Sequence, residues 1–196
     1  MSKSNYSTNR RCDREKYMIY LLVALEMELP DTGALPDNIR LCYTGVGKIN
    51  AAIAAAKVCA QQDCESVVNY GTAGSLKADI AGDLVRVAQI HQRDMDARPL
   101  AALGETPFEE NGGMIDLGGE GVSLSTGDNF VTSPPEIATD IVDMEAYAIA
   151  KACRAAGKPF QCYKYITDLA DKDATQNWRD NVAKGAAMFM LKVNGL

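Results

Sequence analysis

Five short segments of this sequence place polar or glycine residues where a predicted strand ends or a predicted helix begins. They are residues 24–28 (ALEME), 44–47 (TGVG), 71–74 (GTAG), 143–145 (DME) and 167–168 (TD). Glycine lets backbone amides approach a ligand closely, and the first turn of a helix offers free N–H groups to an anion or a hydroxyl. Carboxylates in such places can move protons or stabilise positive charge. The segments predict a ligand site, but they do not say what binds there.

The elements around these segments predict an α/β sheet that is covered on both sides. Apolar and β-branched runs predict strands at residues 18–24, 38–43, 66–70, 84–90, 122–125 and 160–167. Composition predicts helices at residues 48–61, 144–156 and 177–193, the first of them rich in alanine. In open α/β sheets, ligands lie beyond the carboxyl ends of the strands, which is where the segments fall.

Two further regions carry expectations about packing. In the last predicted helix, we expect Trp178, Val182, Met188 and Leu191 on the inner face. Residues 98–121 are rich in Gly, Pro and acidic side chains and show little periodicity. They predict an irregular excursion that could border the site.

Length and composition favour one globular domain. The chain has 196 residues, 47% apolar and 23% charged, and we expect a single domain at residues 17–196 after a polar arm at residues 1–16. No run approaches about 18 consecutive apolar residues, and the arm lacks the apolar core of a secretion signal. We therefore expect a cytoplasmic location and no membrane partner. A net charge of −6 argues against a nucleic-acid partner, which requires a cationic surface.

Cysteine and histidine support neither a disulfide framework nor a cofactor site. The six cysteines form no CxxC pair and are expected to be reduced core residues. His91 is the only histidine and has no cysteine nearby, so zinc is not predicted. No other metal or cofactor is predicted, and His91 is expected to be structural.

Six motifs, in this order, resemble the nucleoside phosphorylase/nucleosidase superfamily. They are ALEMEL, TGVGK before an alanine-rich helix, NYGTAGSL, STGDNFV, VDMEAYAIAKAC and YITDLAD. Within the superfamily they are most similar to the 5′-methylthioadenosine/S-adenosylhomocysteine nucleosidases. The resemblance implies a three-layer α/β/α fold around a mixed, twisted sheet. It also implies hydrolysis of the N-glycosidic bond of an adenine nucleoside, and a homodimer whose contact uses the region of the alanine-rich helix.

The resemblance further implies roles for individual residues. Asp168 would protonate or hydrogen-bond N7 of the purine, Glu28 would activate the attacking water, and Glu145 would bind the ribose hydroxyls. Glu26 is the competing candidate for the base, because spacing does not separate it from Glu28. The other residues that the resemblance places at the substrate are Thr44, Gly45, Thr72, Ala73, Gly74, Phe130, Val131, Asp143, Met144, Lys164 and Thr167.

Departures from the family pattern affect two expectations. One is whether water or phosphate accepts the ribosyl group, and the other is how the 5′ end of the substrate is recognised. Related phosphorylases hold phosphate with a Gly-Asp-Pro turn and an arginine, which ALEME replaces here, so water is the expected acceptor. Phosphorolysis, and a shortened homologue that binds purine nucleosides without turnover, remain the alternatives. Lys164 stands where similar nucleosidases usually have arginine. The chain is short at residues 29–37 and 132–142, which leaves recognition of the 5′ substituent open.

Overall fold

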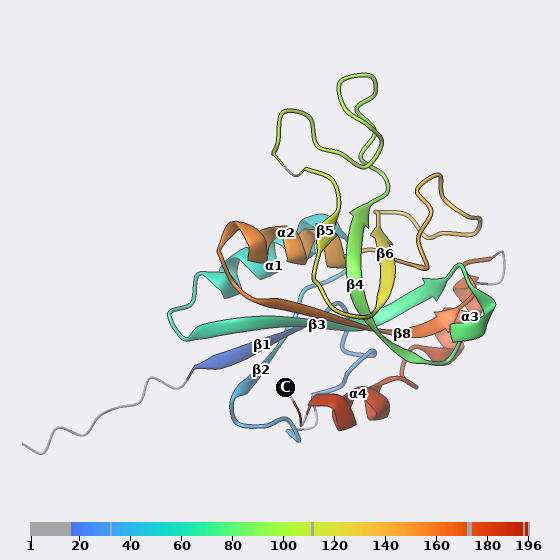
Figure 1. The fold of residues 1–196 in the computed structure, drawn as a ribbon. Coiled ribbons are helices and arrows are strands. Elements are labelled where there is room, and N and C mark those ends of the chain that lie inside the picture. The colour runs from blue at the N-terminus through green and yellow to red at the C-terminus, as the bar shows by residue number, and fades with distance from the viewer. Residues whose placement is uncertain (1–16, 32, 111, 172–173, 194, 196) are drawn as a thin grey trace, which may run out of the picture.

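The computed structural model describes residues 17–196 except 32, 111, 172–173, 194 and 196 (Figure 1). The predicted arm at residues 1–16 lies outside the described residues. The strands are β1 (Met18–Val23), β2 (Ile39–Tyr43), β3 (Cys64–Ser75), β4 (Leu84–Gln92), β5 (Ile115–Asp116), β6 (Val122–Thr126), β7 (Ile141–Asp143) and β8 (Phe160–Asp168). The helices are α1 (Lys48–Cys59), α2 (Ala146–Ala155), α3 (Ala174–Asn181) and α4 (Ala186–Val193), with a 3-10 turn at Ala78–Ile80.

Strand β3 is the centre of a mixed sheet. On one side it pairs with β1 and, at its last two residues, with β7, and on the other side it pairs with β8. Strand β8 also pairs with β4, which pairs with β6, and β6 pairs with β7. Strands β3, β8, β4, β6 and β7 therefore close into a ring, and β1 and β2 extend the sheet beyond it.

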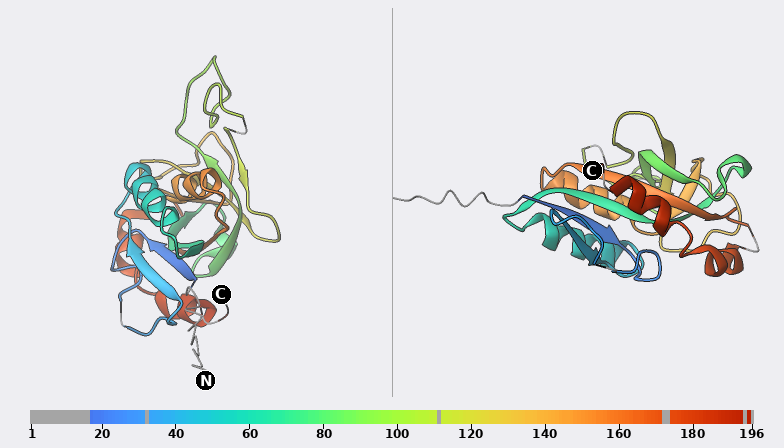
Figure 2. Two further views of the ribbon diagram at one scale, coloured as in Figure 1. Left: turned by 90° about the vertical axis from the view of Figure 1, so that its left-hand side faces the viewer. Right: turned by 90° about the horizontal axis from the view of Figure 1, so that it is seen from below.

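Strand β1 is buried on both faces because its side chains alternate between two helical layers. Tyr20 and Leu22 pack in the cluster that contains residues of α1 and α2. Leu21 and Val23 pack in the cluster that contains Phe189 of α4. The views in Figure 2 show α1 and α2 together on one side of the sheet and α4 on the other. The predicted α/β class with a mixed central sheet is confirmed.

The predicted closing helix at residues 177–193 is two helices, so that prediction is wrong. The chain passes β8 too closely for a side chain at Gly185, where a Cβ would lie 2.3 Å from Cγ of Tyr165. After this break, α4 turns Phe189 and Val193 toward the sheet. Met188 and Leu191, which we expected on the inner face, are 41% and 82% exposed.

Two other regions differ from expectation. Strand β3 does not stop before residues 71–74 but runs through them to Ser75, because the glycines there keep pairing with β8. Residues 98–121 are mostly irregular, as predicted, and extend away from the sheet in Figure 1, but they contain β5. None of the described residues in this excursion borders the cavity described below.

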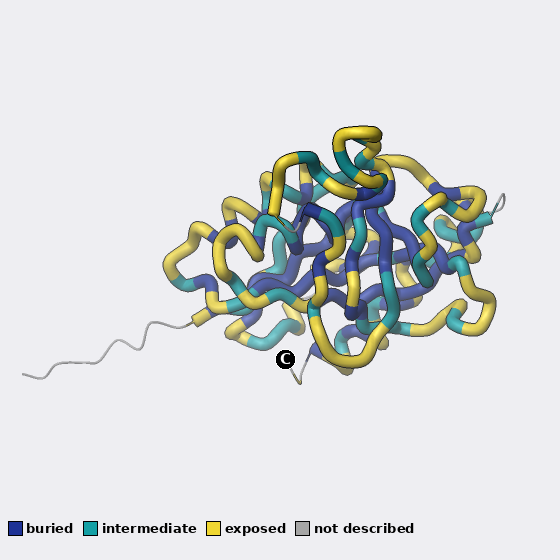
Figure 3. Tube along the Cα trace, turned by 45° about the horizontal axis from the view of Figure 1, so that its top comes forward, coloured by how far each residue is buried: buried dark blue, intermediate teal, exposed yellow. Residues whose placement is uncertain are grey.

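Buried residues are concentrated in the strands, whereas most exposed residues lie in the loops and on the outer parts of the chain (Figure 3). Among the described residues, no helix combines the length and the apolar character that crossing a membrane requires.

Candidate active site

A cavity of about 380 Å³ lies where the carboxyl ends of β1, β2, β6 and β8 meet. Small-molecule sites typically measure about 300–1,000 Å³. Glu28, Glu145 and Asp168 all border this cavity. So do seven of the residues predicted at the substrate, namely Thr72, Ala73, Gly74, Phe130, Val131, Asp143 and Met144.

Glu28 reaches the cavity from the turn after β1. Its Oε1 accepts hydrogen bonds from the backbone N–H of Thr72 at 2.8 Å and from the Thr72 hydroxyl at 2.7 Å, and its Oε2 accepts one from the N–H of Leu25 at 3.1 Å. Gly71 leaves room for this carboxylate, since a Cβ there would lie 3.3 Å from Oε1. Glu26 is exposed and does not border the cavity. The fold therefore separates two glutamates that spacing could not.

Asp168 ends β8, and its carboxylate lies against Gly74 of β3. A Cβ at Gly74 would lie 2.7 Å from Oδ1, so a larger residue would displace the carboxylate. The side chain accepts hydrogen bonds from the Thr167 hydroxyl at 2.8 Å and from the N–H of Ala170 at 2.9 Å. Burial nevertheless raises the pKa of Asp168 above its usual value, because the charged form loses hydration. Asp168 therefore keeps its proton to higher pH than an exposed aspartate.

Glu145 immediately precedes α2 and meets the loop that follows β2. Its Oε1 accepts a hydrogen bond from the N–H of Gly47 at 2.9 Å. Burial, and after it the charge of Asp143, raise the pKa of Glu145 to about 7, although Lys164 opposes the rise. Glu145 therefore changes its charge close to neutral pH.

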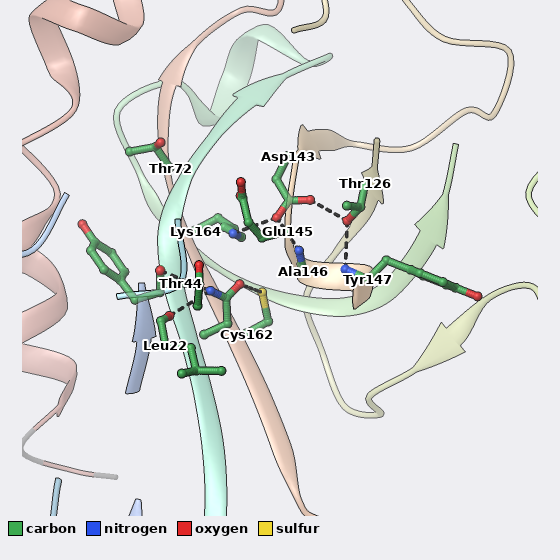
Figure 4. Close-up of polar contacts among 12 residues, drawn as sticks. Leu22, Thr44, Thr72, Thr126, Asp143, Glu145, Ala146, Tyr147, Cys162 and Lys164 are labelled. Atoms are coloured by element: carbon green, nitrogen blue, oxygen red, sulfur yellow. Dashed lines mark hydrogen bonds and ion pairs between the residues drawn. The ribbon is translucent and has the colours of Figure 1, made fainter. Parts of the chain in front are cut away.

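Asp143 and Lys164 form a buried ion pair beside Glu145 (Figure 4). Nζ of Lys164 lies 2.8 Å from Oδ2 of Asp143. The side chain of Lys164 is 1% exposed and that of Asp143 is 0% exposed. Asp143 also accepts hydrogen bonds from the Thr126 hydroxyl at 2.5 Å and from the N–H of Ala146 at 2.9 Å. The two charged groups bind each other and hold the start of α2 against β8. Asp143 still borders the cavity, whereas Lys164 does not.

Thr44, Gly45 and Thr167, which we also predicted at the substrate, do not border the cavity. Thr44 and Gly45 donate their backbone N–H groups to carbonyls at the end of β1. Thr167 donates its hydroxyl to Asp168. These contacts engage the backbone N–H groups of Thr44 and Gly45 and the hydroxyl of Thr167 within the protein and stabilise the segments beside the cavity.

Arg93 borders the cavity and was missed by the sequence analysis. Its guanidinium is buried and donates to the backbone carbonyls of Ser125, Asp143, Gly127 and Asn129 at 2.7–3.1 Å. These bonds join the loop after β6 to the start of α2, which are two walls of the cavity. No local pattern could have found this residue, because its partners come from distant parts of the chain.

Helix α3 supplies a third wall that we did not predict. Thr175, Trp178 and Arg179 border the cavity from this helix. The indole N–H of Trp178, which we expected in the core, donates to the hydroxyl of Thr72 at 3.0 Å. The spacing of three and four residues indicates a shared helix face, but it does not say what that face contacts.

The arrangement offers acid–base chemistry across one cavity. Asp168 can hold a proton, and hydrogen bonds hold the carboxylate of Glu28 in place as a possible proton acceptor. Glu145 is a third carboxyl group at the same cavity. In the part of the chain that the structure describes, no group of three or more His, Cys, Asp or Glu side chains is arranged to hold a metal ion.

Comparisons of the sequence and of the fold with known proteins match the same family. The model of the Phosphorylase superfamily matches residues 32–111 and 114–193. The 5′-methylthioadenosine/S-adenosylhomocysteine nucleosidase of Hydrogenovibrio crunogenus is 27% identical over 185 residues, which cover 80% of each chain. That of Staphylococcus saprophyticus is 29% identical over 168 residues, 72% of this chain and 74% of the relative. A solved structure of the Helicobacter pylori nucleosidase has a TM-score of 0.80 at 24% identity and covers 92% of this chain and 99% of its own.

Proposed function

Because the chain belongs to the phosphorylase superfamily, we propose that it hydrolyses the N-glycosidic bond of an adenine nucleoside of the 5′-methylthioadenosine/S-adenosylhomocysteine type. The observation that carries the proposal is the convergence of Glu28, Glu145 and Asp168 on one cavity. The names of the relatives add the substrate class.

The reaction uses the acids in distinct ways. Asp168 donates its proton to N7, so that the C1′–N9 bond breaks and the purine leaves neutral. The ribosyl group then carries positive charge, which the nearby carboxylates stabilise. Water attacks C1′, and Glu28 accepts its proton. Glu145 accepts hydrogen bonds from the ribose hydroxyls and holds the sugar between the other two acids.

The charges around the cavity favour water over phosphate as the acceptor. A phosphate dianion requires several cationic donors, particularly beside carboxylates. Lys164 is paired with Asp143, and the Nη atoms of Arg93 donate to backbone carbonyls. Arg179 is the remaining cation among the described residues that border the cavity.

The deciding experiment compares adenine release with and without phosphate. We expect adenine to form from 5′-methylthioadenosine in phosphate-free buffer, with free 5-methylthioribose as the second product. A strict requirement for phosphate, with a ribose 1-phosphate formed, would show a phosphorylase instead. Saturable binding without adenine release at any pH would show a binding protein.

The pKa of Glu145 predicts the pH dependence of the reaction. Because this pKa is raised to about 7, the carboxylate that accepts the ribose hydroxyls forms only as pH rises through neutrality. We expect kcat/KM for adenine release to increase across this range. Glu145→Gln lowers both binding and turnover, and its residual kcat/KM loses the rising limb. Persistence of that limb in the variant would assign it to another group.

We also propose that the protein is a homodimer. Val46, Ile49 and Ile53 lie three and four residues apart at the start of α1 and are 42%, 73% and 50% exposed. Ala51 and Ala55, on the opposite face of the helix, are fully buried in the cluster shared with α2. The exposed apolar face therefore supports contact with a second chain.

Light scattering tests this assembly. We expect a mass twice that of the 21.1 kDa chain at micromolar concentration, and a shift toward the monomer in Ile53→Glu. Glu65→Lys, a change in charge at an exposed position of β3 away from this helix, is the control and keeps the dimer. A monomeric wild type would refute the proposal.

A further inference from the structure

The basic side chains around the cavity are not equivalent. Lys164 is fully buried and its Nζ binds Asp143 at 2.8 Å. Arg93 is 7% exposed, and both of its Nη atoms donate to backbone carbonyls. Arg179 borders the same cavity and is exposed. Among the described residues, the guanidinium of Arg179 makes no hydrogen bond and no ion pair, so it is free to meet a ligand.

Helix α3 presents Arg179 to the cavity in a defined orientation. Thr175, Trp178 and Arg179 share one face of the helix and all border the cavity. The indole N–H of Trp178 donates to the hydroxyl of Thr72, which in turn donates to Glu28. This contact ties α3 to β3 and holds the helix face that carries Arg179 at the cavity.

An adenine nucleoside has only one place where it can carry a negative charge. Its purine and its ribose are neutral, and Asp168 and Glu145 provide the groups that these two parts require. The remaining variable part is the 5′ substituent. The cavity wall that these acids do not supply combines two residues with apolar surface, Val46 and Trp178, with the basic residue Arg179. Arginine recognises carboxylates and phosphates through two parallel hydrogen bonds.

We propose that Arg179 makes the site selective for adenine nucleosides whose 5′ substituent carries an anionic group, either a carboxylate or a phosphate. This inference rests on the proposed function and narrows its substrate class. It predicts a higher kcat/KM for S-adenosylhomocysteine, which ends in an amino acid carboxylate, than for 5′-methylthioadenosine, which has no charge at that end. A nucleoside 5′-phosphate presents the same chemistry in a shorter substituent.

The test compares three substrates on two variants. Values of kcat/KM for adenine release are measured for 5′-methylthioadenosine, S-adenosylhomocysteine and adenosine 5′-monophosphate. In Arg179→Gln, we expect kcat/KM to fall about 10- to 100-fold for an anionic substrate, the usual effect of losing a charged hydrogen bond. For 5′-methylthioadenosine we expect less than about a twofold change, because no charged contact is lost. Arg154→Gln, an exposed arginine on α2 outside the cavity, is the control for a lost surface charge and leaves all three unchanged.

The outcomes separate the two proposals. A loss confined to S-adenosylhomocysteine identifies a carboxylate, and a loss confined to the monophosphate identifies a phosphate. Equal losses on all three substrates, or no loss on any, overturn the role of Arg179. If no compound releases adenine, the hydrolase proposal fails. Calorimetric binding of the same compounds to wild type and Arg179→Gln then still decides whether the arginine recognises the anion.

Discussion

Asp168→Asn lowers kcat for adenine release about 100- to 10,000-fold, which is the usual contribution of general acid catalysis. Asparagine keeps the size of the side chain, and its oxygen can still accept the hydrogen bond from Ala170. It has no carboxyl proton to deliver to N7. Because the ground-state contacts remain, the loss falls on kcat and purine binding survives. Steady-state adenine release measures the first effect, and thermal shifts induced by adenine measure the second.

The pH profile provides the control for this variant. Burial raises the pKa of Asp168, and the acid role that we propose for it requires its proton. In the wild type, kcat therefore falls as pH rises through that pKa. The residual activity of Asp168→Asn lacks this falling limb. A near-normal kcat in the variant would mean that Asp168 is not the acid.

Glu28→Gln removes the carboxylate that we propose as the base for the attacking water, and we expect a loss of kcat of about 100- to 10,000-fold. The amide oxygen can keep both hydrogen bonds from Thr72, but the amide nitrogen then faces the N–H of Leu25. Two donors that face each other lose a hydrogen bond worth about 1 kcal/mol, so the variant unfolds at a slightly lower temperature. Adenine release is measured at a temperature well below that midpoint.

Glu26→Gln is the matched control for Glu28→Gln. Both substitutions remove one carboxylate from the same turn, but Glu26 is exposed and lies outside the cavity wall. We expect its kcat and KM to stay within about twofold of wild type, as for most surface substitutions away from special features. If Glu26→Gln were inactive and Glu28→Gln active, the roles assigned to the two glutamates would be reversed.

Local sequence patterns were sufficient for most of the strands and for the position of the site. The apolar run after the arm became β1, because a strand between two helical layers needs apolar side chains on both faces. Acidic and glycine residues at the ends of strands indicated the cavity, because the carboxyl ends of neighbouring strands meet. The motifs shared with the superfamily selected Glu28, Glu145 and Asp168.

Contacts between distant parts of the chain decided the rest. The ion pair of Lys164 with Asp143 gave no local signal, because a buried charge needs a partner and these two residues meet only in the folded chain. Arg93 gave no local signal, because the carbonyls that it binds converge only in the folded chain. The break between α3 and α4 depends on how closely Gly185 approaches Tyr165.

The position of Trp178 depends on both the local sequence and the tertiary structure. Its spacing from Thr175 and Arg179 is a property of the sequence and indicates that the three residues share one helix face. Whether that face packs on the core or borders a cavity depends on where the helix ends and how it lies against β8. The sequence by itself determined most of the strands and the edge of the sheet at which the site lies, because periodicity and strand ends are local. Only the tertiary structure decided which side chains are free to bind a ligand, because that depends on partners far away in the chain.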